Sequence, residues 1–560
     1  MAISKRLCYA LIIVLFVAIV AIILSVYLLG GSSCDGGFTH GAVAADSEIC
    51  SNIGRDILKQ GGSAVDAAIA ALLCTSVIYP QSMGIGGGVI FTIYNASTGN
   101  VEVINARETV PKKFLPNLMA QCAGTTILKP GQQWIGVPGE LKGYEAAHKR
   151  YGRLPWKDLF QPTIQLVTEG VNVSNVLYKF INVTSRLIEA HSVCNLLCKD
   201  KKVLKPGDPL NFIQLAHTLQ TVADEGADSF YKGSIAKRMV EDLNDQGSSL
   251  TLEDLENYKV QILSPLNVPL GNYKLYTAPP PAGGALLTFV LKILEGFHFN
   301  KNAMHTVSKQ IETYHRIAEA LKFANGNRDK LTNPVTSADI AEFIDTWFSN
   351  DFTKEIRSKI DNFGDHDFQF YNLSTVTKKE TFGTTHVSVI SSDGSSVSAT
   401  SSINHVFGSM IYSSSTGIIL NNQLADFCNV HMVSLKEGMQ PPSSMTPAIL
   451  LSKDKKSQLV IGGSGGLRII SATAQAIMNK LWFGYDMKEA ISAPVLHVKL
   501  DNAVEFEASF NLTVREGLKD KRHNISEAKF ALNVVQGVYK EKSCLFPYSD
   551  GRKLGKSAGY

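Results

Sequence analysis

The spacing of apolar positions changes several times along the chain, and each change predicts a different element. An uninterrupted apolar run covers residues 7–29. Because a helix needs about 20 apolar residues to cross the hydrocarbon core of a bilayer, this run predicts a transmembrane anchor. Lys5 and Arg6 precede it, so the positive-inside rule keeps residues 1–6 in the cytoplasm and sends the remainder outward. The alternative is a long signal peptide, although such peptides have a shorter apolar region.

Residues 30–42 are rich in Gly and Ser, a composition typical of a flexible stalk, so we expect folded structure to begin near Val43. Small and apolar residues at helical spacing predict a buried helix over 63–77. Two β-rich runs then predict a hairpin that ends at Arg107. Residues 137–350 alternate helical segments with turns marked by Pro and Gly, and they predict a largely helical middle region.

The polar stretch 361–383 has no clear period and indicates an exposed loop. Apolar and polar residues then alternate on both sides of Asp393-Gly394, which is a strong signal for a β-hairpin. Thr384 would therefore open a strand directly after a loop. A further β-rich run and a helical pattern follow over 448–482. Strands and helices in both halves predict a layered α+β fold.

Composition narrows the function classes. The net charge is +4 over 560 residues, and no basic run with interleaved aromatic residues occurs, which argues against a nucleic-acid partner. The sequence contains no HExxH or CxxC motif, and the glycines at 84–88 lack the spacing of a phosphate-binding loop. We therefore expect no metal and no cofactor.

Sequons and cysteines are typical of an extracellular protein. Six N-x-S/T sequons are spread along the chain, at Asn95, Asn172, Asn182, Asn372, Asn511 and Asn524. Of nine cysteines, Cys8 lies within the predicted anchor, which leaves eight outside. Cys194 and Cys198 are close enough to close a small loop, but spacing alone does not pair the others.

Thr384 is the candidate nucleophile. A threonine hydroxyl is a poor nucleophile unless a base lies beside it, and an N-terminal threonine supplies its own α-amine, with a pKa of about 7.7. An internal threonine has only an amide nitrogen, so this chemistry requires cleavage of the Gly383–Thr384 bond. Taken alone, a threonine at the start of a strand is far more often structural.

The segment GTTHVSVISSDGSSVSATSSINHVFGS, residues 383–409, resembles the processing site and catalytic hairpin of the γ-glutamyltransferases, a family of N-terminal nucleophile hydrolases. Further resemblances follow in the family's order: PQSMGIGGGVIFTIYN, INARE, VPGELKGYEAAHKRYGRLPW, PPSSMTPAIL, IGGSGG and the terminal SAGY. They cover essentially the whole chain outside the anchor. The region from LVIGGSGG to the end looks most like the leukotriene-cleaving branch of the family.

The resemblance implies an αββα sandwich behind an N-terminal transmembrane helix. One precursor would give a large subunit, with its ectodomain over 43–383, and a small subunit over 384–560. Thr384 would attack the γ-glutamyl amide of glutathione or its conjugates, with leukotriene C4 as one candidate, and water, amino acids or dipeptides would accept the acyl group. A single-pass type II protein of the plasma membrane with an extracellular catalytic domain is expected.

The resemblance also assigns the remaining site residues by position. It implies that the substrate α-carboxylate binds to Arg107, Ser443 and Ser444, and that the α-ammonium binds to Asn404 and Asp426. Ser402 would supply a hydroxyl beside the nucleophile. The oxyanion would be stabilised by the backbone N–H groups of Gly465 and Gly466. Without the resemblance, Arg107 would be interpreted as a surface arginine, Ser443 and Ser444 as turn residues, and Gly465 and Gly466 as a tight turn. It further implies disulfides Cys50–Cys74 and Cys194–Cys198.

One departure affects the expected activity. Gln423 stands where the family usually has Glu, so a negative charge near the substrate ammonium is lost, while Gln still offers an acceptor oxygen. A catalytically weak surface protein that binds without turnover is therefore an alternative. A second alternative is another amidase of the same fold, against which Arg107 with Ser443 and Ser444 argues.

Overall fold

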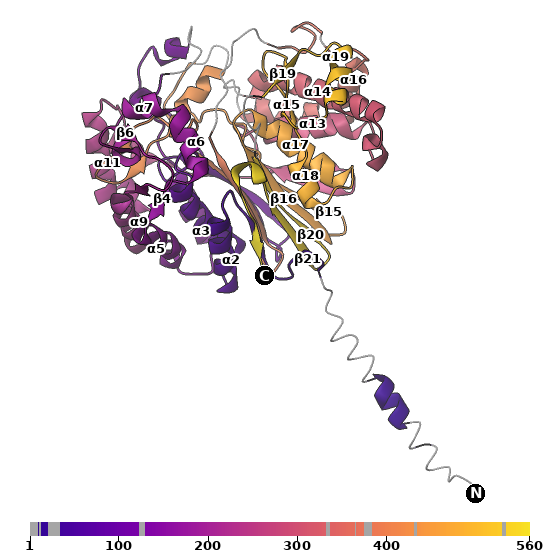
Figure 1. Cartoon of the computed structure of the whole chain (residues 1–560), viewed down its shortest axis with the longest axis horizontal. Helices are drawn as coiled ribbons and strands as arrows, with labels where there is room; N and C mark the ends of the chain where they lie inside the picture. Colours follow the sequence, from indigo (N-terminus) through magenta and orange to yellow (C-terminus); the bar gives the residue numbers. More distant parts are fainter. Residues whose placement is uncertain are drawn as a thin grey trace.

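The structure, a computed structural model of the whole chain, describes residues 9, 13–20, 34–122, 129–331, 337–364, 366–373, 383–429, 434–528 and 534–560. Two antiparallel sheets stack at the centre, and helices cover their outer faces (Figure 1). The first sheet has the order β22 (Ala558–Gly559), β1 (Ala42–Ala44), β11 (Thr385–Ile390), β12 (Ser396–Ser402), β2 (Gly88–Tyr94), β3 (Val101–Ala106) and β8 (Gln261–Leu263). The second has the order β21 (Cys544–Ser549), β20 (Val534–Glu541), β16 (Ser457–Ser464), β15 (Ala448–Ser452), β10 (Tyr273–Thr277) and β9 (Leu266–Leu270).

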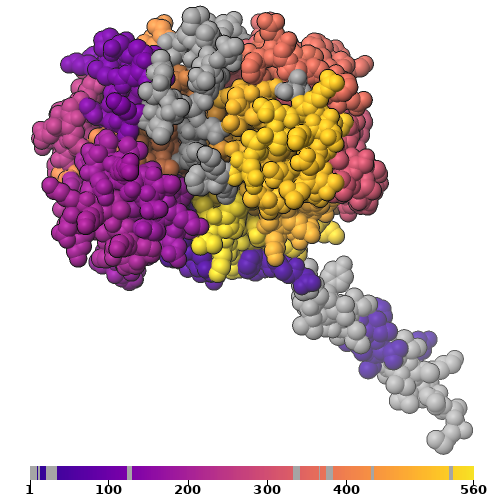
Figure 2. Space-filling model, turned by 45° about the horizontal axis from the view of Figure 1, so that its top comes forward, coloured from indigo at the N-terminus to yellow at the C-terminus, as the bar shows by residue number. Residues whose placement is uncertain are grey.

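Each sheet has its own helical layer and its own apolar core. The first sheet is covered by α2 (Glu48–Lys59), α3 (Ala64–Ile78), α4 (Glu140–Tyr151), α5 (Gln161–Glu169), α9 (Ile213–Glu225) and α11 (Ser234–Asp245). The second is covered by α13 (Gly284–Glu295), α14 (Val307–Asn327), α15 (Ser337–Phe348), α16 (Asn350–Lys359), α17 (Arg468–Leu481), α18 (Met487–Ser492) and α19 (Leu512–Asp520). In Figure 2 the indigo-to-magenta surface and the orange-to-yellow surface accordingly cover opposite sides of the molecule.

Short elements complete both layers. They are α6 (Asn175–Val183), α7 (Ser185–Glu189), α8 (Cys194–Leu197), α10 (Asp228–Tyr231), α12 (Leu252–Asn257), β4 (Val171–Asn172), β5 (Cys198–Lys199), β6 (Lys202–Val203), β7 (Pro209–Leu210), β13 (Tyr412–Ser413), β14 (Ile418–Ile419), β17 (Leu496–Val498), β18 (Val504–Phe506) and β19 (Ile525–Glu527).

Most of the predicted elements are present. The helix expected over 63–77 is α3, which begins after a capping box between Ser63 and Asp66. The hairpin ending before Arg107 is β2 with β3, and the hairpin around Gly394 is β11 with β12, with Gly394 in the left-handed region at φ +85°. The αββα arrangement follows from the two stacked sheets and their outer helices.

The middle region is less helical than we expected. Residues 261–277 form β8, β9 and β10, which extend the edges of both sheets. Pro265 lies between β8 and β9, and Pro269 lies within β9, where the edge of the sheet tolerates a residue without an N–H donor.

The N-terminal segment also differs in part from the expected stalk. Cys34 is bonded to Cys544, and Phe38 N–H donates to Leu545 O at 2.8 Å, so residues 34–42 attach to the body before β1 begins. The described part of the loop 361–373 contains no helix or strand, and residues 374–382 lie outside the described residues. Among the described residues no helix is long and apolar enough to cross a membrane, and most of the predicted anchor lies outside them.

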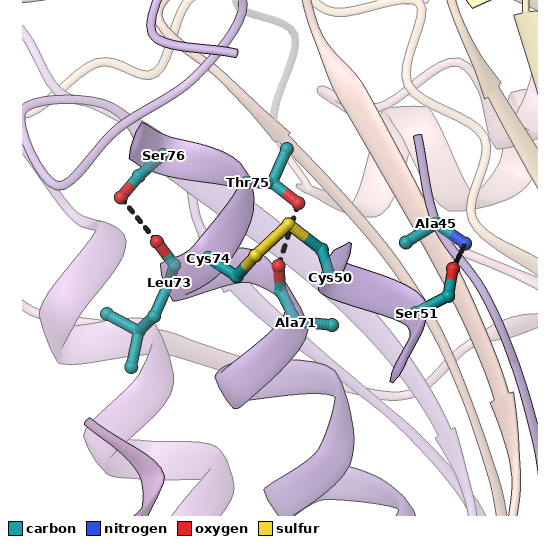
Figure 3. The surroundings of a disulfide bond; sticks show 8 residues. All are labelled: Ala45, Cys50, Ser51, Ala71, Leu73, Cys74, Thr75 and Ser76. Carbon is teal, nitrogen blue, oxygen red and sulfur yellow. Dashed lines mark hydrogen bonds between the residues drawn. A yellow bond between two sulfur atoms is a disulfide. The ribbon is translucent and has the colours of Figure 1, made fainter. Parts of the chain in front are cut away.

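Both predicted disulfides are present. Cys50 on α2 is bonded to Cys74 on α3, which fastens the amphipathic α2 to the buried α3 (Figure 3), and Cys194 is bonded to Cys198. Two further bonds, Cys34–Cys544 and Cys122–Cys428, join residues more than 300 positions apart. These two pairings could not be predicted from cysteine spacing.

A buried histidine lies between the two sheets, close to the start of β11. His386 Nδ1 is 2.8 Å from Thr400 Oγ1 and Nε2 is 3.0 Å from Ser388 Oγ. Its ring faces Gly462 of the opposite sheet, where any Cβ would collide with it. Burial lowers the pKa of His386 from 6.5 to about 3. The sheets therefore meet here through a neutral imidazole held between hydroxyl groups.

This histidine predicts acid sensitivity with a definite sign. Because its folded pKa lies below its unfolded value, the unfolded chain binds the proton first, and stability is lost as the pH falls below 6.5. At pH 5 His386 alone should cost about 2 kcal/mol. We expect the thermal midpoint of the ectodomain to fall more steeply between pH 7 and pH 5 than that of His386→Gln, which keeps a neutral hydrogen-bonding group. Parallel pH profiles for the two proteins would contradict this.

Candidate active site

Thr384 lies directly before β11 and is buried, with φ at +86°. A β-branched residue seldom adopts this left-handed conformation, so its surroundings must hold it there. Its N–H donates to Ser82 O at 2.9 Å, and its Oγ1 donates to Ser402 Oγ at 3.0 Å. A Cβ on Gly383 would collide with Asn404 O, so only glycine fits before the threonine. Family resemblance identified Thr384 as the candidate nucleophile, and the structure places this residue directly before the central strand β11.

Ser402 ends the partner strand β12, Asn404 follows two residues later, and both line the same pocket as Thr384. Ser402 Oγ accepts from Asn404 N–H at 2.8 Å as well as from the Thr384 hydroxyl. Asn404 has φ of +74°, and its Nδ2 donates to Asn422 O at 3.1 Å. These contacts leave Asn404 Oδ1 as an acceptor at the pocket that Asn404 lines.

Lys553, near the C-terminus, holds the other side of Thr384. Its Nζ donates to Thr384 O at 3.0 Å, to Asp46 Oδ2 at 2.9 Å and to Ser464 Oγ at 3.1 Å. Asp46 Oδ2 also accepts from Thr385 Oγ1 at 2.8 Å. The Asp46 side chain is fully buried and that of Lys553 is 11% exposed. The start of β11 is therefore tied to both ends of the chain by a buried ion pair that sequence reasoning missed.

Arg107 and Asp426 line the pocket and form a second ion pair. Arg107 is 1% exposed, its Nε donates to Pro441 O at 3.0 Å, and its Nη2 donates to Pro442 O at 2.7 Å. The same Nη2 lies 2.6 Å from Asp426 Oδ2. The resemblance assigns these two side chains to opposite charges of a substrate, and the structure shows that they pair with each other.

Gln423 contacts Asp426 directly. Its Nε2 donates to Asp426 Oδ2 at 2.8 Å, while its Oε1 is buried and has no hydrogen-bond partner among the described residues. The amide therefore orients the carboxylate and presents a free acceptor beside it. A buried acceptor without a partner is costly, which favours a donor from a ligand at this position.

The two serines of PPSSM follow the prolines that Arg107 contacts, and they line the same pocket as Arg328, which sequence reasoning missed. Ser443 Oγ accepts from Met445 N–H at 3.1 Å, and Ser444 Oγ accepts from Arg328 Nη1 at 2.9 Å. Both hydroxyl protons thus stay available for a bound anion. Burial lowers the pKa of Arg328 to about 10, so this guanidinium remains charged at neutral pH.

Two buried carboxyls behind Arg107 do not add charge. Burial raises the pKa of Glu108 to about 8 and that of Glu140 to about 8. Both are therefore mostly neutral at pH 7. The charges that face the pocket are those of Arg107, Arg328 and Asp426.

Gly465 and Gly466 form the turn between β16 and α17. Their φ angles are +123° and +62°, a conformation that glycine adopts readily. Gly466 lines the pocket and Gly465 does not. The N-terminus of α17 follows at once, so the positive end of its dipole lies beside the pocket that Gly466 lines.

Almost every predicted site residue lines one pocket. It is lined by Arg107, Arg328, Thr384, Ser402, Asn404, Gln423, Asp426, Asn429, Pro442, Ser443, Ser444, Met445, Gly466, Leu467 and Ile469. Arg328 and Asn429 had not been predicted. Asn429 follows Asp426 by three residues, a spacing that could have drawn attention to it, whereas Arg328 ends a long helix and carries no sequence signal of its own.

His315, Glu319 and His523 form a separate buried cluster with a possible set of metal-ligand atoms. Lys322 Nζ, however, lies 3.1 Å from His523 Nδ1 and 3.2 Å from Glu319 Oε1. An ammonium group in this position repels a metal cation, and we assign the cluster to packing.

Two stacked antiparallel sheets between helical layers, with a buried threonine opening a central strand, define the fold of the N-terminal nucleophile hydrolases. The crystal structure of cephalosporin acylase from Bacillus halodurans has the same fold, with a TM-score of 0.81 and 24% identity over 94% of this chain and 96% of that one. Residues 50–560 match the γ-glutamyltranspeptidase family, and the chain belongs to it. Relatives include the protein named glutathione hydrolase 5 proenzyme from Mus musculus, 49% identical over 94% of each chain, and its namesake from Homo sapiens, 48% identical over 93% of each.

The Lys553–Asp46 pair predicts a large stability effect. Lys553→Met should destabilise the protein by roughly 3–5 kcal/mol, because it leaves a buried carboxylate without its counter-charge. Asp46→Asn combined with Lys553→Met should recover part of this loss. Lys556→Met is the matched control, because the Lys556–Glu48 pair is exposed and should contribute little. Equal thermal midpoints for Lys553→Met and Lys556→Met would refute the role of the buried pair.

Proposed function

We propose that the chain is a γ-glutamyl hydrolase and acyltransferase that acts on glutathione and its conjugates after cutting itself before Thr384. The observation that carries this is the shared pocket: the Thr384 hydroxyl faces the same cavity as Arg107, Asp426 and the paired serines. The names of the relatives, glutathione hydrolase and proenzyme, support both the substrate and the processing.

The cleavage step uses the contacts around Thr384. Its hydroxyl adds to the carbonyl carbon of Gly383, the C–N bond breaks, and an ester forms while the α-amine of Thr384 is released. Water then hydrolyses the ester and completes the cut. The left-handed backbone at Thr384 supports this step, because conformational strain at the bond is relieved when the bond breaks.

The freed α-amine serves as the base in catalysis, since its pKa near 7.7 lets it accept the hydroxyl proton at neutral pH. The Thr384 hydroxyl attacks the γ-carbonyl carbon of the substrate, the amide C–N bond breaks, and the leaving amine takes the proton. The resulting γ-glutamyl ester transfers to water, an amino acid or a dipeptide. N–H groups at Gly465 and Gly466, beside the N-terminus of α17, would stabilise the oxyanion.

The remaining pocket residues fit the α-amino acid end of a γ-glutamyl group. Its carboxylate would take the place of Asp426 at Arg107 Nη2 and accept from the hydroxyls of Ser443 and Ser444. Its ammonium would donate to Asp426 and to the unpaired Oε1 of Gln423. Bulky conjugates such as leukotriene C4 are candidate substrates because the C-terminal region resembles the leukotriene-cleaving branch.

We further propose that the enzyme is a glycosylated type II protein of the plasma membrane, with large and small subunits from one precursor. The apolar run 7–29 after Lys5 and Arg6 supports the anchor. Five of the six sequon asparagines are exposed and Asn95 is partly so, which suits glycan attachment. Four disulfides fit an oxidising compartment.

Release of glutamate from glutathione by the purified ectodomain tests this function. We expect turnover, with transfer to an added dipeptide. A correctly folded ectodomain that binds glutathione without releasing glutamate would instead support the surface binding protein, and activity restricted to other acyl groups would support a different amidase.

Self-cleavage gives a separate prediction. The mature protein should contain a small chain whose N-terminal sequence is TTHVSV. Thr384→Ala should remain uncut, because no hydroxyl is available, while Thr384→Ser should be cut. Reducing gels and N-terminal sequencing decide this, and an active protein recovered only as an uncut chain would rule it out.

Gln423→Glu should strengthen donor binding. A charge-assisted hydrogen bond to the ammonium contributes roughly 1.5–3 kcal/mol against 0.5–1.5 for a neutral one. The new carboxylate also loses the hydrogen bond to Asp426 and repels it, so we expect a decrease in KM for glutathione of less than about tenfold. Because the ammonium is remote from the scissile bond, kcat should change little. An unchanged or raised KM would show that Gln423 is not at the ammonium site or is already optimal there.

A further inference from the structure

Two of the four disulfides span the bond before Thr384. Cys34 and Cys122 precede this bond, while their partners Cys544 and Cys428 follow it. Cleavage would therefore leave two chains that are still joined covalently. The two bonds differ in position, because Cys34–Cys544 fixes the N-terminal segment to β21, whereas Cys428 belongs to an element of the pocket.

That element is η6 (Gln423–Asn429), a 3₁₀-helix. With three residues per turn, positions 423, 426 and 429 align on one face. Gln423, Asp426 and Asn429 all line the pocket. The orientation of η6 therefore sets the position of every group that this helix presents to a ligand.

The other faces of η6 lie on a small apolar cluster built from both sides of the cleavage point. Leu424 and Phe427 pack with Leu118 and Trp134, and Cys122 and Cys428 lie half-buried at its margin. Cys122 ends η1 (Leu118–Cys122), the short 3₁₀-helix beneath η6. A cluster of this size provides a surface for η6 but few contacts to fix its rotation.

The two ends of η6 are held differently. Before the helix, the fully buried Asn421 donates to Gly86 O and Gly136 O, each at 2.9 Å, and accepts from Gln423 N–H at 2.9 Å. At the far end, Cys428 is the covalent attachment, one residue before Asn429 and two after Asp426. Hydrogen bonds thus fix Gln423 at the start of η6, and Arg107 and Gln423 hold the Asp426 carboxylate at its middle, whereas the disulfide attaches the far end of the helix.

We infer that Cys122–Cys428 is a cross-chain link that positions η6, and with it Asp426, for the ammonium and carboxylate of the donor substrate. The inference rests on the proposed function and assigns a positioning role to a bond remote from the nucleophile. In the cleaved enzyme the link ties a substrate-binding helix of the small chain to η1 of the large chain.

Paired substitutions in the full ectodomain test this. Cys122→Ser with Cys428→Ser should raise KM for glutathione roughly three- to tenfold, as expected when a charge-assisted contact is partly misaligned. The inhibition constant of L-glutamate, which carries the same two charged groups, should rise by the same factor. The value of kcat should stay within about twofold, because the Thr384 contacts are untouched.

Cys34→Ser with Cys544→Ser is the matched control. It removes the other cross-chain bond, far from the pocket, and should leave both constants unchanged. On non-reducing gels each pair alone should still show linked chains, and only the fourfold variant should separate into two bands without reductant.

The outcomes are distinguishable from failure of the proposed function. If the wild-type protein releases no glutamate from glutathione, or gives one band on reducing gels, the proposed function is refuted. The positioning role of Cys122–Cys428 then falls with it. An active, cleaved enzyme whose KM is unaffected by the Cys122–Cys428 pair, or is equally affected by the control pair, would overturn the positioning role. If the serine pair does not fold, Cys122→Ala with Cys428→Ala replaces it. Failure of both pairs to fold while the control pair folds would also overturn the inference, because the bond would then serve folding itself.

Discussion

The backbone of Thr384 sits in a left-handed conformation that a β-branched residue adopts only under constraint, and the surrounding groups come from distant parts of the chain. Ser82 accepts from its N–H, Ser402 accepts from its hydroxyl, and Lys553 donates to its carbonyl. These partners lie in the loop before β2, at the end of β12 and near the C-terminus. The two-sheet fold brings them together, so the geometry at one residue depends on the correct stacking of both halves.

The charges of the pocket follow from burial. Glu108 and Glu140 are held mostly neutral, so the positive charge of Arg107 is balanced by Asp426 from another element. This pair is complementary to a zwitterion, because each member can exchange its partner for the opposite group of a ligand without leaving a buried charge unpaired. Gln423 takes part without adding charge, since it donates to Asp426 and its Oε1 has no hydrogen-bond partner in the described part of the chain. Arg328 adds a second positive charge beside Ser444, so the pocket offers cations to a carboxylate and the Asp426 carboxylate to an ammonium, which suits an α-amino acid group.

Sequence reasoning succeeded where the signal was local or where a motif carried it. The period of α3 and the hairpin of β11 and β12 could be predicted from residue patterns, and resemblance placed Arg107, Ser443 and Ser444 at the pocket. It failed for residues whose role arises only from the fold. Lys553 and Arg328 lie in polar segments like many others, and the pairing of Cys122 with Cys428 joins positions that no spacing rule connects. The strands over 261–277 were missed because Pro265, Pro269 and Gly271 mark turns in the sequence, and only the fold shows that Pro269 lies in an edge strand.

The central claim is that Thr384, freed at the N-terminus of the small chain, carries the γ-glutamyl group between donor and acceptor. Rapid acid quenching of the enzyme during turnover of glutathione, followed by mass spectrometry of the small chain and its peptides, measures this directly. We predict a small chain that carries one γ-glutamyl group, located at Thr384 and lost on addition of a dipeptide acceptor. A small chain that stays unmodified during turnover, or one modified at any other residue, would contradict the account.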